Sequence, residues 1–397
     1  MVASPLRVVV FYKGTVAPDH GSRRILEQMA WLVADGCRVS LVPVVTQGAP
    51  APEISGAVGA RGIEVLNPIL VRVHSPAARA WLGLAEHPSN LRDIQRSVRN
   101  ADWILEGNTI IVGLSDLART ARRRAVISWD GDAASRWHTT YVRWLVRRDP
   151  VRAARRSIFV VSACRGERYL ARHRDFVTVP GPADLAALSR TGHRGTRVVV
   201  VPNVVWLRQI EGGAVVAPPR LDILFVGSAY GPNVDGLRWF LRRVWPSVRQ
   251  SSPKTRLTVA GRDINVGVIY ESAVSPPGVE FVGRVADLET LYRAAKVVIV
   301  PLFYGSGVPN KFLEALAANA GIVTTKYVAT AVGTPDGLRS NDRPNAWSEA
   351  VLSALHDPPS ARLDPAVRAG LLTTHGPAGF DVAMRAVVER VRRLRSR

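Results

Sequence analysis

Short runs of β-branched residues alternate with segments of helical spacing through the first half of the chain. An apolar run at 6–11 is followed by a polar loop at 12–22 and then by a helical segment whose apolar positions are Ile25, Met29, Leu32 and Val33. That spacing places the four side chains on one helix face. Further apolar runs predict strands at 38–44, 63–66, 103–106, 125–128, 176–179 and 198–201. The alternation predicts a largely parallel sheet with helices on both faces.

A second series of the same kind follows a stretch at 202–219 that contains several prolines and glycines. Its predicted strands are 221–226, 256–260, 279–282, 297–302 and 321–324, and its predicted helices are 235–250, 286–295, 311–320 and 381–397. We therefore expect an α/β fold of two doubly wound, Rossmann-like domains that are joined by a linker and face a cleft. In sheets of this kind, ligands bind at the carboxyl ends of the strands.

Composition supports globular domains and leaves the partner open. The 397 residues are 47% hydrophobic with a mean hydropathy of +0.05, so large cores can form. With 53 basic and 32 acidic residues the net charge is +21, which favours polyanions such as nucleotide phosphates, nucleic acid or an anionic membrane. Because 48 of the basic residues are arginine, a genome-wide preference for arginine is an alternative cause of the excess.

Cysteine usage and hydropathy bear on the compartment. Cys37 and Cys164 are the only cysteines, too few for a disulfide framework or a cysteine-based metal site. We find no run of roughly 18 apolar residues that would suggest a membrane span. The chain also enters its first predicted strand without a signal-peptide segment. We expect a cytoplasmic protein, with peripheral attachment to the inner face of the plasma membrane as an alternative.

The segment 297–325 carries the pattern most specific for chemistry. An apolar strand leads through a Gly-Ser-Gly turn at 305–307 directly into a helix. Such a turn exposes backbone N–H groups to a phosphate at the positive end of the helix dipole. Lys311 in the first helical turn can add a cation, and Glu314 can accept paired hydrogen bonds from a ribose diol. A plain turn is the alternative interpretation of the glycines alone.

This segment resembles the donor-binding signature of the group 1, or family 4, glycosyltransferases, which have the two-domain GT-B fold. The residues that carry the resemblance are Pro301-Leu302, Gly305-Ser306-Gly307-Val308, Asn310-Lys311 and Leu313-Glu314-Ala315, the pattern of the subgroup with Gly-Ser-Gly before Asn-Lys. Residues 224–235 (LFVGSAYGPNVD) are similar to the opening of the family's second domain, and 200–204, 257–262 and 279–285 follow the family's order. The resemblance is close over about 198–330 and loose before it.

The resemblance implies a retaining glycosyltransferase that uses a nucleotide-sugar donor and needs neither a metal ion nor a further cofactor. Glu314 would hold the ribose as the second carboxylate of the family's E-x7-E pair, whose first position falls on Ser306. The loop 228–233 lacks the Arg and Lys that clamp the diphosphate in many members, so Lys311 is our first catalytic candidate for stabilising that charge. The implied donor-binding residues are Gly21, Gly227, Ser228, Arg262, Arg284, Gly305, Ser306, Gly307, Val308, Asn310, Lys311 and Glu314.

Two further catalytic candidates lie in the first domain. The loop at 13–22 occupies the place of the family's loop over the donor phosphates, which makes His20 a candidate, a solvent-facing histidine being the alternative. Asp130 follows a predicted strand and resembles the aspartate of a His-Asp element in related enzymes, with Trp129 where the histidine would be. Its hypothetical role is to polarise an acceptor hydroxyl. Asp130 and Asp132 also spell D-x-D, the manganese motif of the other major glycosyltransferase fold, which the two-domain organisation disfavours; we expect no metal site.

Positive charge gathers in 119–174, where fifteen arginines and four acidic residues give a local excess of +11. Aromatic and basic residues recur there at helical spacing on neighbouring faces, at Trp137, Tyr141 and Trp144 and at Arg136, Arg143 and Arg147. This arrangement suits an anionic membrane surface or an anionic or lipid-linked acceptor. The alternative is that the aromatic residues pack into the domain and the arginines are solvated.

These observations predict one domain organisation and leave several functions open. We expect an N-terminal acceptor-side domain at 1–203, a linker at 204–219, a nucleotide-sugar domain at 220–375, and a helix at 376–397 with the option of packing back on the first domain. The acceptor would be a glycan, a lipid-linked molecule or a natural product. A sugar-nucleotide epimerase, a phosphorolytic enzyme and a non-catalytic sugar-nucleotide-binding protein remain alternatives on the same fold. Nucleic-acid binding is a remote one, because zinc-finger spacing, an RNP-type motif and a basic zipper are missing from the sequence.

Overall fold

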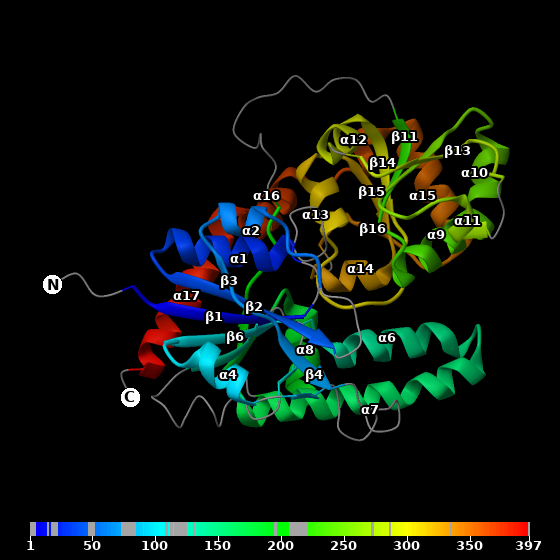
Figure 1. Ribbon diagram of the computed structural model, residues 1–397. Coiled ribbons are helices and arrows are strands. Elements are labelled where there is room, and N and C mark those ends of the chain that lie inside the picture. The colour runs from blue at the N-terminus through cyan, green and yellow to red at the C-terminus, as the bar shows by residue number, and fades with distance from the viewer. Residues whose placement is uncertain are drawn as a thin grey trace. The chain divides into compact units, whose positions relative to one another are not determined.

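The computed structural model divides into two compact units, which Figure 1 traces from blue to red. Unit 1 comprises Met1–Pro202 and Phe380–Arg397, and unit 2 comprises Asn203–Gly379. The residues that the structure describes are 5–13, 16, 23–46, 52–72, 85–89, 91–107, 110–111, 114, 125–129, 132–193, 197–205, 221–270, 274–285, 287–333 and 335–395.

Unit 1 is built on one largely parallel sheet. Within its described residues the strands run in the order β10-β9-β8-β6-β1-β2-β4-β5-β7, with β3 beside β2, and only β4 and β5 pair antiparallel. The strands are β1 (Arg7–Tyr12), β2 (Arg38–Thr46), β3 (Glu64–Val65), β4 (Ile69–Arg72), β5 (Ala85–Pro88), β6 (Trp103–Gly107), β7 (Ile110–Ile111), β8 (Ala125–Trp129), β9 (Phe176–Val179) and β10 (Val198–Val200). All seven strands predicted from the apolar runs of this half are present.

The helices of unit 1 are α1 (Arg23–Ala34), α2 (Ala57–Ala60), α4 (Leu91–Val98), α6 (Ala134–Val146), α7 (Pro150–His173), α8 (Pro182–Arg190) and α17 (Pro377–Arg395). In α1 the predicted apolar face is buried at Ile25, Met29 and Leu32. Helix α17 lies beside α1 in Figure 1, and Trp31 Nε1 donates a hydrogen bond of 3.0 Å to Asp381 Oδ1. Most of the C-terminal helix therefore belongs to the first unit.

An ion pair is enclosed in the core of unit 1. Arg174, just before β9, donates from Nε and Nη2 to the two carboxylate oxygens of Glu106 on β6, each at 2.8 Å, and neither side chain is exposed. Paired charges of this geometry satisfy each other's hydrogen bonds away from water. Arg174 is one of the fifteen arginines of 119–174, but its side chain is buried and adds no positive charge to the surface.

Unit 2 contains a second parallel sheet whose strand order is β13-β12-β11-β14-β15-β16 in the described residues. The strands are β11 (Leu221–Val226), β12 (Leu257–Ala260), β13 (Val279–Gly283), β14 (Ala295–Val300), β15 (Gly321–Thr324) and β16 (Arg339–Ser340). On β11, Leu224 and Val226 join the core on one face of the sheet, while Ile223 and Phe225 join the core on the other. Both faces are covered, as expected for doubly wound domains.

The helices of unit 2 are α9 (Gly231–Arg243), α10 (Trp245–Ser251), α11 (Val266–Tyr270), α12 (Leu288–Ala294), α13 (Asn310–Ala317), α14 (Lys326–Ala331), α15 (Pro344–His356), the 3-10 helix η2 (Pro358–Ala361) and α16 (Pro365–His375). The prediction of one helix over 235–250 was wrong, because the segment is divided into α9 and α10 at Val244. Pro246 lies in the first turn of α10, and proline cannot donate the hydrogen bond that would continue a helix.

Candidate functional site

The candidate site lies where the strand order of unit 2 reverses direction. β11 pairs with β12 on one side and with β14 on the other, and all three strands point the same way. The loops after β11 and β14 therefore leave the same edge of the sheet and diverge to opposite faces. Parallel sheets of this order bind ligands in the crevice at this switch point.

The glycine turn predicted from the sequence follows β14 and requires its glycines. Gly305 has φ +143° and Gly307 has φ +69°, conformations that other residues rarely adopt. A Cβ at Gly305 would also lie 3.1 Å from the Tyr327 hydroxyl. The turn leads into α13, whose N-cap residue is Pro309, which has no side-chain group that could cap the helix. The start of α13 thus has the features of an anion site, namely N–H groups and the positive end of the helix dipole.

Lys311 in α13 reaches across to the loop after β11. Its Nζ donates to Asn233 Oδ1 at 2.7 Å and lies 4.6 Å from the centre of the Phe225 ring. A Cβ on Gly227 would approach that Nζ to 2.8 Å and Asn233 Cγ to 2.9 Å. Glycine at 227 therefore leaves the space in which the lysine and the asparagine meet.

The environment of Lys311 disfavours its charge. Burial lowers the pKa of this lysine to about 7, and the carboxylate of Glu314 acts in the opposite direction with a smaller effect. An amine with this pKa is partly neutral near pH 7. A diphosphate placed beside it would favour the charged form, so ligand binding and protonation of Lys311 are coupled.

Glu314 is held by a buried tyrosine. Tyr292 of α12 is almost fully buried and donates from its hydroxyl to Glu314 Oε2 at 2.7 Å. Burial, together with the charge of Glu314 and this hydrogen bond, raises the pKa of Tyr292 well above its usual value, so the hydroxyl keeps its proton and remains a donor. Lys311 and Glu314 are three positions apart on α13 and so share one side of the helix.

Asn203, the first residue of unit 2, holds the glycine turn in place through hydrogen bonds. Its Nδ2 donates to Val308 O at 2.8 Å and to Asn310 Oδ1 at 3.0 Å. The Val308 side chain is itself part of the hydrophobic core. The side chains of Val308 and Asn310, which the resemblance assigned to donor binding, thus help to hold the turn in place.

The remaining predicted donor residues of unit 2 are distributed along the same sheet edge. Ser228 is exposed after β11, and its carbonyl accepts from Asn233 Nδ2 at 3.0 Å. Arg262 follows β12, and its carbonyl accepts from Ala229 N at 3.0 Å, which joins the two loops. Arg284 is exposed after β13, one strand further from the switch point, and Ser306 lies in the glycine turn. The four residues thus lie along the carboxyl-terminal edge of one sheet.

The unit 1 candidates His20, Gly21 and Asp130 lie outside the described residues. The start of α6, just after Asp130, is described, and it is capped by carboxylates of the protein itself. Ala133 N donates to Asp184 Oδ1 at 3.0 Å, and Ser135 N donates to Glu167 Oε1 at 2.8 Å. Burial raises the pKa of Glu167, with the charge of Asp184 adding to it. This helix N-terminus is therefore occupied by carboxylates and is not an anion site like that of α13.

The position of Tyr141 agrees with the alternative in which the aromatic residues of α6 pack into the domain. Tyr141 is buried, and its ring lies 5.2 Å from that of Trp137 and 6.2 Å from that of Trp144, centre to centre. Arg152 and Arg156 of α7 place their guanidinium groups 5.9 Å from the Tyr141 ring. The three aromatics form a ladder, and the ring at its centre contributes to packing within unit 1.

Sequence reasoning missed three residues that shape the site. Asn233 binds Lys311, Tyr292 binds Glu314, and Asn203 binds the turn, across separations of 78, 22 and 105 to 107 positions. Asn203 and Asn233 lie in segments that resemble the family. The resemblance therefore pointed to these positions but did not predict which residues they contact. Nothing in the local pattern distinguishes Tyr292 from an ordinary core residue.

The two parallel-sheet α/β units, the second with a glycine turn before α13 at its switch point, have the architecture of the GT-B glycosyltransferase fold. Residues 220–357, within unit 2, match the family model described as Glycosyl transferases group 1. A curated relative, the "Uncharacterized 44.6 kDa protein in cps region" of Klebsiella pneumoniae, is 31% identical over 124 residues. That match spans 29% of this chain and only 32% of the relative.

Solved structures with the same fold extend over almost the whole chain. Anabaena HepE in complex with UDP and glucose is 14% identical, with a TM-score of 0.62, and the match covers 97% of this chain and 99% of HepE. Sucrose-phosphate synthase from Thermosynechococcus elongatus is also 14% identical, with a TM-score of 0.64 and coverage of 97% and 99%. These likenesses confirm the predicted fold class.

Proposed function

We propose that the chain is a retaining, metal-independent glycosyltransferase that moves a sugar from a nucleoside diphosphate sugar to a hydroxyl group of its acceptor. The proposal rests on the positions of Lys311 and Glu314, which lie on one side of α13 beside the glycine turn at the switch point. A cation and backbone N–H groups suit a diphosphate, and a carboxylate suits a ribose diol. The match of residues 220–357 to the group 1 model supports this assignment.

In the proposed reaction, the protein stabilises the leaving nucleoside diphosphate. Charge develops on the diphosphate as the bond to the sugar breaks, and donors placed in advance lower the barrier. Lys311 supplies a positive charge there once it is protonated, and the N–H groups of the turn supply neutral donors. The acceptor hydroxyl attacks from the face that the diphosphate leaves, which retains the anomeric configuration. The acceptor is a glycan, a lipid-linked molecule or a natural product, and Asp130 and His20 are the proposed residues on its side.

UDP and UDP-glucose are the first ligands to test, because similar structures contain them. Calorimetric titration should show UDP binding to the wild-type protein. Glu314→Gln should weaken it about 10- to 100-fold, because hydrogen bonds to an ionised carboxylate are worth roughly 1.5–3 kcal/mol. Glu349→Gln, an exposed carboxylate on α15, is the matched control and should leave binding unchanged. Equal affinity of both variants for UDP would remove Glu314 from the site.

Turnover separates transfer from the alternatives that share a donor site. With a panel of acceptors and UDP-glucose, a retaining transferase forms a product whose anomeric proton shows the donor's configuration by NMR. Activity that survives EDTA agrees with metal independence. Conversion of the donor sugar without an acceptor would indicate an epimerase, and binding without any turnover would indicate a non-catalytic protein.

A further inference from the structure

Helices α6 and α7 form an antiparallel hairpin in unit 1, seen side by side in Figure 1. The buried positions of α7 include the small residues Ala153, Ala163 and Gly166, which allow a neighbouring helix to approach closely. Across the hairpin, His138 of α6 stacks on Phe159 of α7 with ring centres 5.7 Å apart. One side of α7 therefore packs against α6 and the rest of unit 1.

The opposite side of α7 is an exposed stripe along the whole helix. Its members recur every three or four residues and are Val151, Arg155, Ile158, Val161, Arg165, Arg168 and Arg172. At that spacing they share one helix face. We call this set the α7 stripe. A helix of 24 residues is about 36 Å long, so the stripe is an extended, nearly linear surface.

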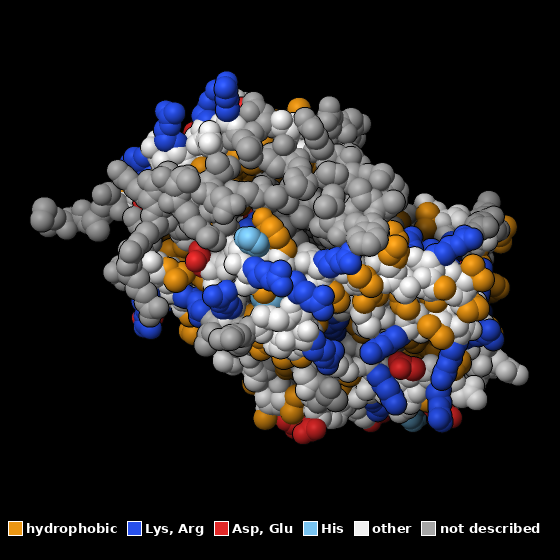
Figure 2. Space-filling view, turned by 90° about the horizontal axis from the view of Figure 1, so that it is seen from below, with side chains coloured by type: hydrophobic (Ala, Val, Ile, Leu, Met, Phe, Trp, Pro, Cys, Tyr) orange, Lys and Arg blue, Asp and Glu red, His pale blue; other side chains and the backbone are white. Residues whose placement is uncertain are grey.

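Helix α7 carries a strong excess of positive charge, with six arginines. All of α7 is described, and its one carboxylate, Glu167, is buried and accepts from Ser135 N. Figure 2 shows blue and orange side chains mixed over the face of the molecule on which α7 lies.

Exposed aliphatic side chains gather on the same hairpin. Ten large hydrophobic residues are exposed in the described part of the chain, and four of them lie within positions 146–161. They are Val146, Val151, Ile158 and Val161, with 48–62% of each residue exposed. Scattered single residues of this kind need no explanation, whereas three on one helix face among arginines form a patch.

An anionic bilayer satisfies both parts of this patch. Lipid phosphates attract the arginines, whose long stems lie along apolar surface, while valine and isoleucine enter the boundary between headgroups and acyl chains. A polyanion in water would pair with the arginines and leave the aliphatic groups hydrated. Among the described helices none is long and apolar enough to cross a membrane, and α7 itself carries six arginines. The α7 stripe therefore suits contact with a bilayer surface and not passage through the bilayer.

We propose that the α7 stripe is the docking surface by which this protein binds an anionic lipid bilayer, with α7 parallel to the membrane plane. The proposal differs from the sequence interpretation, which placed the membrane-facing residues on the aromatic side of α6. It does not depend on the proposed glycosyl transfer, since the donor site lies in unit 2.

Co-sedimentation of the full chain with vesicles tests the proposal. Wild-type protein should bind vesicles of phosphatidylcholine mixed with phosphatidylglycerol, bind pure phosphatidylcholine weakly, and dissociate as salt rises. Replacing the four arginines of the stripe by glutamine should reduce binding by roughly fivefold per arginine. Serine at Val151, Ile158 and Val161 should also weaken binding while the salt dependence remains.

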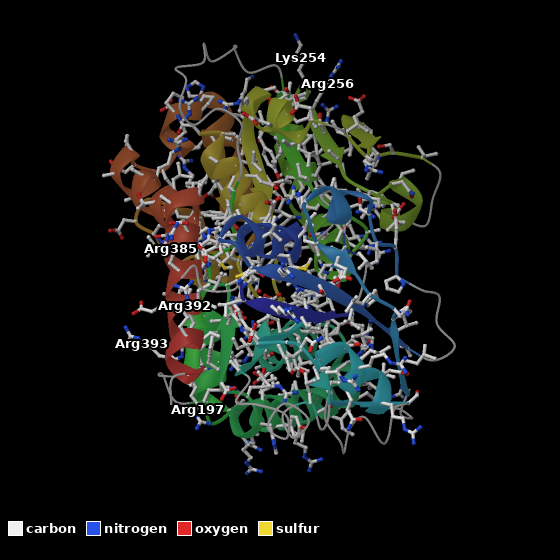
Figure 3. All side chains as sticks on the ribbon, turned by 60° about the vertical axis from the view of Figure 1, so that its left-hand side comes forward. Arg197, Lys254, Arg256, Arg385, Arg392 and Arg393 are labelled. Carbon is white, nitrogen blue, oxygen red and sulfur yellow. The ribbon has the colours of Figure 1, made fainter. Side chains whose placement is uncertain are left out.

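The matched control removes the same number of charges from exposed positions of unit 2. Its substitutions are Arg242→Gln, Arg243→Gln, Lys254→Gln and Arg256→Gln. Figure 3 shows Lys254 and Arg256 extending away from the ribbon. This variant should retain nearly all vesicle binding, and circular dichroism should show that every variant is folded.

Three results would overturn the proposal. Wild-type protein that ignores anionic vesicles at low salt has no such surface. If the stripe variant and the unit 2 control lose binding equally, the vesicles are attracted by the net charge of the protein and not by α7. Binding to duplex DNA at physiological ionic strength without binding to vesicles would identify nucleic acid as the polyanion.

Discussion

Replacing Lys311 by methionine should stabilise the ligand-free protein and at the same time abolish donor binding. Methionine has a similar length and no charge. The pKa of Lys311 is about 7 in the folded protein, compared with 10.5 for an ordinary lysine, which means that keeping it charged costs up to about 5 kcal/mol. Loss of the hydrogen bond to Asn233 offsets part of this gain, so we expect the free energy of unfolding to rise by about 2–4 kcal/mol at or below pH 7.

The pH dependence gives the sign of the effect. Below pH 7 the lysine is protonated in both the folded and the unfolded state, and the full cost of burying the charge is present. Between pH 7 and 10.5 the unfolded state binds more protons, so the wild-type protein becomes more stable as pH rises. Above 10.5 both states are neutral. The advantage of Lys311→Met should therefore shrink across this window.

Urea unfolding of the wild type, Lys311→Met and Lys254→Met at several pH values measures these differences. Lys254 is exposed, so its substitution should change the free energy of unfolding by less than about 0.5 kcal/mol. UDP binding to the wild type should also take up protons near pH 7, which calorimetry in buffers of different ionisation enthalpy detects. If Lys311→Met is no more stable than the wild type at pH 6, and the difference does not change with pH, then Lys311 is an ordinary solvated lysine and our reasoning is wrong.

Three other substitutions test neighbouring parts of the argument. Tyr292→Phe removes a hydrogen bond to a carboxylate, so it should lower the free energy of unfolding by about 1–3 kcal/mol and weaken UDP binding, as calorimetry would show. Gly227→Ala places a Cβ 2.8 Å from the Nζ of Lys311 and should reduce UDP affinity at least about tenfold in the same titration, whereas Gly59→Ala, with no atom within 4 Å, should not. Glu106→Gln removes the carboxylate that balances the buried charge of Arg174, which should cost about 3–5 kcal/mol in urea unfolding, and a smaller loss would show that other groups compensate this charge.

Much of the fold could be predicted because its sheets are buried on both faces. A strand such as β11, with one set of residues in each core, must be apolar at nearly every position, and a run of this kind stands out in a sequence. The short strands β4, β5 and β7 at one end of the unit 1 sheet and the small helices were not predicted. Their residues are fewer, and their conformation depends on the strand beside them more than on local pattern.

The local arrangement of the candidate site could be predicted as well, because the glycine turn, Lys311 and Glu314 lie within ten positions of one another. Donor binding by these residues stays a prediction. The chain positions of Lys311 and Glu314 alone place them on one side of a helix. Their partners could not be predicted in the same way. Asn233, Tyr292 and Asn203 meet them only after distant loops are brought to one sheet edge.

The surface features likewise divide into those that the sequence predicts and those that only the structure shows. The sequence by itself determined that 119–174 is strongly basic and that its aromatic residues recur at helical spacing, because composition and spacing are local properties. Only the tertiary structure decided which side of each helix is exposed, since that depends on what packs against it: Tyr141 is buried, Arg174 is enclosed with Glu106, and the outward face of α7 combines arginine with valine and isoleucine. Local spacing defines the faces of a helix, and packing against the rest of the chain selects the one that meets the solvent.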